Sequence, residues 1–335
     1  MSQTATGLVV ETSHLSKTYG PFLAVRDLNM NIAAGSIYGF IGPNGAGKTT
    51  TMRMLATLLR PSGGDARVGG YSVVSDPKAV KRQIGYMPDF FGVYDNMKTW
   101  EYLDFFAASY KVPANRRVGM IDDLLNLVDL SHKKNDYVDA LSRGMKQRLS
   151  IARTLVSEPT LLILDEPASG LDPRARIELR ELLKELGRLG KTILISSHIL
   201  SELAEMCTHI GIIERGVLLA SGSVQEILQR VQPIRVLLLR LLADPGTAAA
   251  TVQGVPGVVG VEVVDEPASP AQPAPAEGAA NRPPLSLRVR FDGDERAMGL
   301  LLWRLVQAGL PVYSFSEEVS NLEDIFLQVT KGLVD

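Results

Sequence analysis

The stretch that decides the fold reads Gly42-Pro43-Asn44-Gly45-Ala46-Gly47-Lys48-Thr49-Thr50. It fits the phosphate-loop pattern G-x-x-x-x-G-K-[ST] at every fixed position. An apolar run of strand length precedes it at residues 36–41, and residues 50–59 after it have helical character. A loop between a strand and a helix is the context that the motif requires, which argues against a chance glycine-rich turn. We therefore expect residues 42–50 to hold a nucleoside triphosphate.

Each residue type in this loop has a physical task. The glycines let consecutive backbone N–H groups point at phosphate oxygens, and the following helix adds its positive N-terminal end. Lys48 places a point charge on the outer phosphates. Thr49 offers a hydroxyl to Mg²⁺, which prefers oxygen ligands. A nucleoside triphosphate with Mg²⁺ is thus expected at this loop.

The composition is that of an ordinary globular protein. The chain has 335 residues, of which 45% are hydrophobic and 21% charged, enough for about two domains. A net charge of -2 gives no basic excess, so we expect no nucleic-acid partner. No apolar segment approaches the roughly 18 residues of a membrane span. Residues 1–11 show no secretory signal, and a single Cys207 excludes an intrachain disulfide framework, so we expect a cytosolic location.

Two carboxylates follow a second apolar run. Residues 160–164 read as a buried parallel strand that delivers Asp165 and Glu166 at its C-terminal end. In nucleotide sites of this kind, the first acid holds Mg²⁺ through its water shell, and the second polarises a water for attack on the terminal phosphate. The alternative is a solvated strand end, which the intact phosphate loop upstream disfavours.

A further buried strand is expected at residues 191–197, with His198 directly after it. Its C-terminal end lies on the same rim as the acids and the phosphate loop. His198 can therefore reach the terminal phosphate.

The segments around these motifs predict secondary structure but indicate no particular chemistry. We expect strands at residues 8–11 and 24–32, with Tyr19 in a turn between them, and a helical insertion at about residues 90–157. Taken by itself, a tyrosine beside a turn is more often explained by packing than by stacking on a nucleotide base. The insertion includes helices at residues 99–110, 117–128 and 142–157, the last with Ser142 as its N-cap. The aromatic residues at 90–94 suggest a contact surface.

The composition changes after Gly222, so we expect an ATPase domain at residues 1–231 and a smaller α+β domain at residues 232–335. The smaller domain reads as the βαββαβ order of a ferredoxin-like unit. Proline and alanine dominate residues 265–284, a composition suited to a linker. Residues 319–330 form an amphipathic pattern typical of a helix. Its role, whether dimer stabilisation, packing or sensing, stays open.

The order of these motifs resembles the ATP-binding subunit of an ABC transporter over about residues 7–225. The resemblance implies an α/β fold of the phosphate-loop type with a helical subdomain. It implies that Tyr19 stacks on adenine and that Asp172 communicates across a dimer interface. It also implies that Ser142 and Gly144 bind the terminal phosphate of ATP held by the opposite subunit. A helix N-terminus is suited to that anion, and each site then needs two chains, hence a homodimer.

Two departures from the family pattern stand out. The usual signature is Leu-Ser-Gly-Gly-Gln, whereas this chain has Arg143 and Met145 at the third and fifth positions. Asp89 stands where the family generally has a glutamine that reaches Mg²⁺ or its water. An aspartate is shorter and charged but still offers oxygen, so Asp89 is kept as a candidate magnesium ligand, against a purely structural role in the loop.

The C-terminal part resembles that of exporter-type ABC ATPases, including multidrug-resistance subunits whose permease is a separate chain. The resemblance implies an ATPase that closes around two ATP molecules and opens after hydrolysis. It also implies that the chain is peripheral on the inner face of the membrane, with residues 90–94 receiving a permease helix. One alternative is a soluble ABC ATPase acting on ribosomes or nucleic acid. Another is a nucleotide switch without turnover, which the intact Lys48, Asp165, Glu166 and His198 argue against.

Overall fold

The structure is a computed structural model that describes residues 7–89, 96–199, 203, 205–231, 235–264 and 284–318. The chain divides into two compact units between Ile227 and Leu228, and each unit is described by itself. The domain boundary between residues 231 and 232 stays a prediction.

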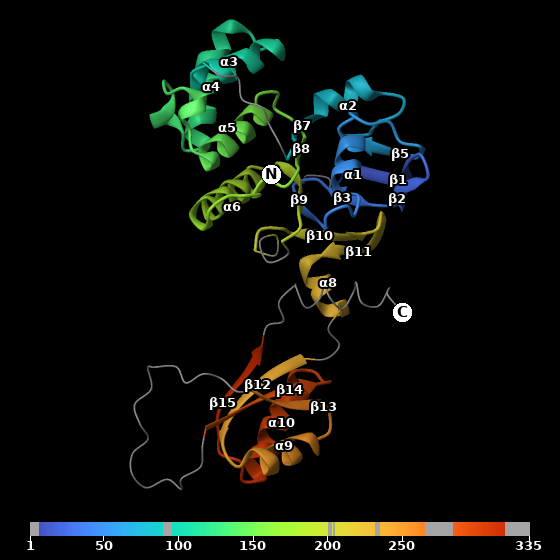
Figure 1. Ribbon diagram of the computed structural model, residues 1–335, viewed down its shortest axis with the longest axis vertical. Helices are drawn as coiled ribbons and strands as arrows, with labels where there is room; N and C mark the ends of the chain where they lie inside the picture. Colours follow the sequence, from blue (N-terminus) through green and yellow to red (C-terminus); the bar gives the residue numbers. More distant parts are fainter. Residues whose placement is uncertain are drawn as a thin grey trace, which may run out of the picture. The chain divides into compact units, whose positions relative to one another are not determined.

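The central sheet of the first unit positions the phosphate loop, Asp165, Glu166 and His198. Its strand order is β11-β10-β4-β9-β8-β7 (Figure 1). All neighbouring pairs are parallel except β10 with β11, which forms the antiparallel edge. The strands are β4 (Ile37–Ile41), β7 (Ile84–Met87), β8 (Leu161–Leu164), β9 (Thr192–Ser197), β10 (His209–Glu214) and β11 (Val217–Ser223). Because parallel strands end at one edge, the residues that follow β4, β8 and β9 meet there.

The middle strands of this sheet are buried along their whole length. Every residue of β4, β8 and β9 is buried. Strands of a parallel sheet are covered on both faces, and continuous aliphatic runs such as Leu161–Leu164 are typical of them. The expected strands at 160–164 and 191–197 are therefore confirmed.

A second, antiparallel sheet has the order β2-β1-β5-β6, and β3 also pairs with β1. Its strands are β1 (Leu8–Tyr19), β2 (Phe22–Leu28), β3 (Asn31–Ala33), β5 (Gly63–Val68) and β6 (Tyr71–Ser72). Helix α1 (Lys48–Leu55) shares one buried cluster with both sheets, in which Met52, Met54 and Leu55 are fully buried. This shared core fixes the start of α1 at the end of β4.

Two predicted strands in this region exist, but their predicted extents were wrong. The expected strand at residues 8–11 continues to Tyr19, because its polar second half pairs with both β2 and β5. The expected strand at residues 24–32 is broken between β2 and β3. The break falls at residues 29–30; Asp27, inside β2, has a φ of 48°, in the left-handed region.

The helical part of the first unit agrees with the sequence analysis. Helices α3 (Thr99–Ser109), α4 (Ala114–Leu127) and α5 (Arg143–Leu155) pack against one another (Figure 1). Ser142 is the N-cap of α5, and its hydroxyl accepts the Met145 N–H at 3.3 Å. This cap was predicted, and it is confirmed. The remaining helices of the unit include α2 (Pro77–Gln83), the short η1 (Ser131–Lys133) and η2 (Val138–Ala140), and α6 (Pro173–Arg188).

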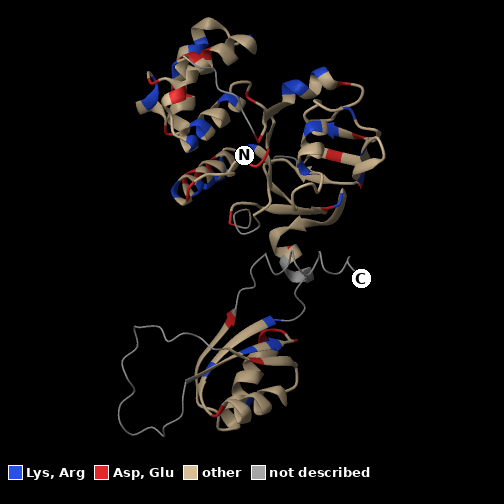
Figure 2. Ribbon diagram, in the orientation of Figure 1, with Lys and Arg blue, Asp and Glu red and all other residues tan. Residues whose placement is uncertain are grey.

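Helix α6 follows the acid strand and is strongly amphipathic. Its buried face consists of Leu179, Leu182, Leu183 and Leu186. Basic and acidic residues follow one another along the helix (Figure 2), and some of them form ion pairs spaced three or four residues apart. Pairs at this spacing support a solvent-facing helix. The helix therefore covers the sheet with leucines and presents charge to water.

The second unit has the order β12, α9, β13, β14, α10, β15 in sequence, and its sheet has the antiparallel order β13-β14-β12-β15. This is the strand arrangement of a ferredoxin-like unit. One buried cluster, which includes Leu237, Leu239 and Phe291, joins the sheet to its helices. The elements are β12 (Arg235–Leu242), α9 (Pro245–Gln253), β13 (Val258–Val264), β14 (Pro284–Phe291), α10 (Glu295–Gln307) and β15 (Val312–Glu318), and α8 (Val224–Val231) precedes them.

Several sequence predictions fall outside the described residues: the aromatic loop 90–94, the linker 265–283 and the tail helix 319–330. Pro284, which was expected in the linker, is instead the first residue of β14 and pairs with Leu242. A strand tolerates proline at its first position, where the missing N–H interrupts the ladder least. None of the helices in the described residues is long and apolar enough to cross a membrane.

The central sheet gives a stability prediction. Ile163 in β8 is fully buried, and Ile163→Ala should lower the unfolding free energy by about 2–5 kcal/mol through lost burial and a cavity. The matched control is Ile177→Ala on α6, where the side chain is 52% exposed. Urea denaturation followed by circular dichroism compares the two variants. Equal destabilisation by both would contradict the assigned core.

Candidate active site

The phosphate loop begins where β4 ends, and two glycines explain its shape. A side chain on Gly42 would place its Cβ 2.2 Å from the carbonyl oxygen of Ile213. Gly47 is the N-cap of α1 at a φ of 106°, and a Cβ there would lie 2.7 Å from the carbonyl oxygen of Ala24. Because backbone leaves no room at either position, the loop can close only with glycine. Its curvature puts the N-terminus of α1 at the sheet edge.

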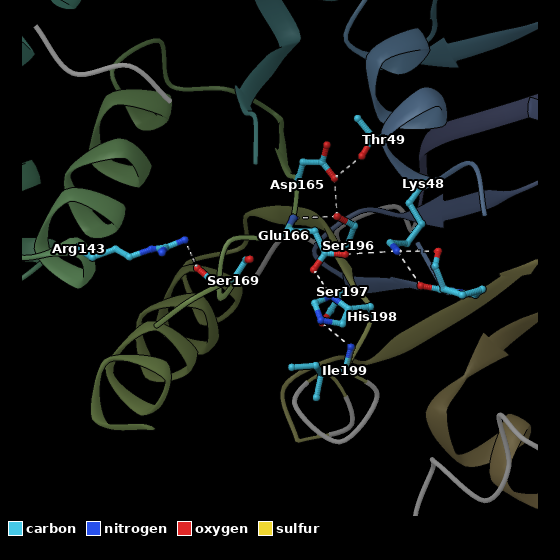
Figure 3. A network of polar contacts seen from close by, with 12 residues as sticks. Lys48, Thr49, Arg143, Asp165, Glu166, Ser169, Ser196, Ser197, His198 and Ile199 are labelled. Carbon is cyan, nitrogen blue, oxygen red and sulfur yellow. Dashed lines mark hydrogen bonds and ion pairs between the residues drawn. The ribbon is translucent and has the colours of Figure 1, made fainter. Parts of the chain in front are cut away.

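Lys48 is buried at the first position of α1 and turns back over the loop. Its Nζ donates to the carbonyl oxygens of Gly42 at 2.6 Å and Pro43 at 3.2 Å. The same Nζ lies 3.3 Å from Glu166 Oε1, with both side chains largely buried (Figure 3). A buried ammonium needs such partners, because an unpaired one would lose its hydration without compensation. The cation is thus held at the mouth of the phosphate loop.

Asp165 follows β8 and is fully buried. Its Oδ1 accepts hydrogen bonds from Ser196 Oγ at 2.7 Å and Thr49 Oγ1 at 3.2 Å. Burial raises the pKa of Asp165; hydrogen bonds from Ser196 and Thr49 lower it, and the charges of Asp89 and Glu166 raise it again. Its Oδ2 has no hydrogen-bond partner in the described part of the chain. A buried carboxylate with one free oxygen beside the Thr49 hydroxyl has the donor chemistry that a magnesium ion requires.

Glu166 lies between two cationic or titratable groups. Its Oε2 is 2.8 Å from His198 Nδ1, and its Oε1 faces Lys48 (Figure 3). Its backbone N–H donates to Ser196 Oγ at 2.9 Å, and its φ of 47° is in the left-handed region. A non-glycine residue in that region is a strained geometry often found at functional sites. The carboxylate is therefore directed across the sheet edge rather than along the strand.

The predicted residues of α5 and α6 form a separate group. Ser142 is exposed at the start of α5, and a Cβ on Gly144 would lie 2.9 Å from the Ala175 Cβ of α6. Asp172 is the N-cap of α6 and accepts the Ala175 N–H at 2.9 Å. Within the described ranges, no hydrogen bond or ion pair joins Ser142 or Gly144 to the phosphate loop of this chain.

Two further predicted residues lie at the margin of the site. Tyr19 ends β1 and is 46% exposed, with Lys17 Nζ 5.4 Å from its ring centroid. Asp89 follows β7 at the same sheet edge as the acids, and its charge contributes to the raised pKa of Asp165. The structure thus gathers Lys48, Thr49, Asp165, Glu166 and His198 in one network and leaves Tyr19, Ser142 and Gly144 apart from it.

Sequence reasoning missed Ser196, whose hydroxyl contacts both acidic residues of the network. The register of β8 and β9 pairs Leu164 with Ile195, so the next residues along each strand are neighbours. A serine at the end of a buried strand beside an acid strand was the available signal. Gln147 was missed as well; its Nε2 donates to the carbonyl oxygen of Pro167 from inside α5.

Comparisons with known proteins agree with this geometry. The family model "ABC transporter" matches residues 25–169. The bacitracin transport ATP-binding protein BcrA of Bacillus licheniformis is 43% identical over 63% of this chain and 68% of its own length. The daunorubicin/doxorubicin resistance ATP-binding protein DrrA of Streptomyces peucetius is 34% identical over 96% of this chain and 92% of its own.

A solved structure of an ATP binding subunit of an ABC transporter is also similar. It has a TM-score of 0.60 and 30% identity, and it covers 66% of this chain and 92% of that one. The phosphate loop, the acid strand and the histidine thus stand in a fold and a sequence that both match one family. The chain belongs to the ATP-binding proteins of ABC transporters, a family of ATPases.

Proposed function

We propose that this chain is the ATP-hydrolysing subunit of an exporter whose membrane permease is a separate chain. The observation that carries the hydrolytic part is the Glu166 carboxylate held between Lys48 and His198 at the end of the acid strand. The export part is supported by relatives named for bacitracin transport, daunorubicin and doxorubicin resistance, and Nod factor export.

Residues 42–50 would hold the phosphates of ATP through backbone N–H groups and Lys48. Mg²⁺ would be held by Thr49 and Asp165, with Asp89 as a further oxygen donor, and the free Oδ2 of Asp165 supports this assignment. When bound, the ion neutralises charge on the outer phosphates. Lys48 then turns from the carbonyls of Gly42 and Pro43 to phosphate oxygens.

Glu166 acts as the general base. Its carboxylate accepts a proton from the attacking water, and His198 holds that carboxylate beside the place where the terminal phosphate would lie. Ser196 fixes both acids by donating to Asp165 and accepting from the Glu166 N–H. The rate acceleration then comes mainly from positioned charges that need no reorganisation during the reaction.

Two copies of the chain close around two ATP molecules. Ser142 and Gly144 bind the terminal phosphate of ATP held by the opposite chain, and their separation from this chain's own phosphate loop fits that role. Asp172 communicates across the interface, and Tyr19 stacks on adenine with its exposed ring. The closed dimer opens after hydrolysis and drives the permease.

The proposed cellular location follows from the proposed permease partner. We place the chain in the cytoplasm, peripheral on the inner face of the membrane through the permease, with the loop of residues 90–94 as the proposed contact. Tagged chain purified from detergent-solubilised membranes should bring an integral membrane protein with it. Recovery of ribosomal proteins or nucleic acid instead would support the alternative of a soluble ABC ATPase.

Glu166→Gln tests the general base. The amide keeps the shape and one oxygen but cannot accept the proton, so steady-state phosphate release should fall by roughly 10²- to 10⁴-fold while ATP still binds. ATP should also trap the variant as a dimer, which size-exclusion chromatography detects. Glu181→Gln, an exposed glutamate on α6, is the control and should keep the wild-type rate. Turnover near the wild-type rate in the Glu166 variant would refute the assignment.

Lys48→Ala tests the phosphate loop. Loss of the cation should weaken ATP affinity by roughly ten- to a hundredfold, since a charge-assisted contact to phosphate is removed. Titration with a fluorescent ATP analogue measures the Kd. Lys78→Ala, an exposed lysine on α2, should bind as the wild type does. An unchanged Kd in the Lys48 variant would count against the phosphate role.

A further inference from the structure

The start of α5 is hydrogen-bonded to the loop that follows Glu166, and Arg143 makes one of the two contacts. Arg143 Nη2 donates to the carbonyl oxygen of Ser169 at 2.9 Å (Figure 3). Gln147, four residues later on the same face of the helix, donates to the carbonyl oxygen of Pro167. Two side chains of one helix face therefore bind two carbonyl groups of one loop.

The loop is shaped to receive the guanidinium group. Gly170 has a φ of 67°, and a Cβ built on it would lie 2.4 Å from Arg143 Cζ. The guanidinium thus occupies the space that any side chain at position 170 would need. The flat guanidinium group of Arg143 packs on Gly170. Its fork of N–H groups also reaches the carbonyl oxygen of the neighbouring Ser169.

The loop that Arg143 and Gln147 contact begins directly after Glu166. The Ser169 N–H donates to the Glu166 carbonyl oxygen at 3.0 Å, so Ser169 bonds to Glu166 on one side and to Arg143 on the other. At its far end the loop passes into Asp172, the N-cap of α6. A displacement of the α5 start therefore reaches the backbone of Glu166 through two hydrogen bonds.

We propose that Arg143 is a positioning residue that links the N-terminus of α5 to the hydrolytic carboxylate of the same chain. The inference rests on the proposed function, in which Ser142 and Gly144 bind the terminal phosphate of the partner chain's ATP. When the start of α5 binds the ATP held by the partner chain, that contact then sets the position of Glu166 in this chain's own ATP site. Arg143 makes this connection because it joins the start of α5 to the loop that follows Glu166.

The experiment compares Arg143→Ala, Arg143→Lys and the control Arg174→Ala. Arg174 lies in the first turn of α6 with its side chain 90% exposed, and it pairs with Glu178 and not with the loop. In ATP-free protein, hydrogen exchange of the amides at residues 168–172 should be faster in Arg143→Ala and unchanged in Arg174→Ala. Arg143→Lys, which keeps one donor but no planar fork, should fall between them.

Steady-state kinetics separate positioning from binding. Arg143→Ala should lower kcat by roughly ten- to a hundredfold, the effect of a displaced catalytic group, while KM and the Kd for ATP stay at wild-type values. Arg143→Lys should recover part of kcat. A raised KM with unchanged kcat, or unchanged exchange in the loop, would overturn the inference. Absence of ATP turnover in the wild type would instead refute the proposed function. The hydrogen-exchange result would still decide whether Arg143 holds the loop that follows Glu166.

Discussion

The ion pair between Lys48 and Glu166 is the interaction on which the rest of the site depends. It joins the residue that opens α1 to the residue that follows β8, across a gap of more than a hundred positions in sequence. Both side chains are largely buried, and a buried charge is tolerated only with a partner in good geometry. The pair requires β4, β8 and β9 to lie side by side, and the sheet order places them so. The apolar strands therefore serve as the frame that brings opposite charges together.

Around this pair, the polar groups at the sheet edge are hydrogen-bonded to one another. Ser196 contacts both acids, His198 contacts Glu166, and Thr49 contacts Asp165. Such a network costs desolvation free energy, which hydrogen bonds offset only when nearly every group has a partner. Among the described residues of this network, Asp165 Oδ2 and Glu166 Oε1 accept no hydrogen bond, although Glu166 Oε1 faces Lys48 as an ion pair. Asp165 Oδ2 lies where an oxygen-seeking cation would complete the set. Preorganisation of this kind is how a site stabilises charge without rearranging during the reaction.

The contacts of α5 extend this network away from the sheet edge. Arg143 and Gln147 hold the loop after Glu166, and Asp172 at the end of that loop starts α6. The chain thus connects two regions that each have the character of an anion site: the phosphate loop with its cation, and the exposed start of α5. A dimer that places ATP between these regions would make each chain sensitive to the other. The path from Arg143 to Glu166 runs through Ser169, whose carbonyl oxygen accepts from Arg143 and whose N–H donates to the Glu166 carbonyl oxygen.

Local patterns in the sequence determined the phosphate loop, the acid strand, the histidine after β9 and the cap at Ser142, because each depends on residues close together in the chain. The buried parallel strands could be predicted for the same reason, since continuous aliphatic runs occur in few other places. The full length of β1 and the break between β2 and β3 could not, because pairing with remote strands overrides weak local preference. Likewise only the tertiary structure decided that Ser196 lies beside Asp165 and that Arg143 reaches Ser169. Those contacts arise from the register of β8 on β9 and from the packing of α5 against the start of α6, which join residues that are far apart in sequence.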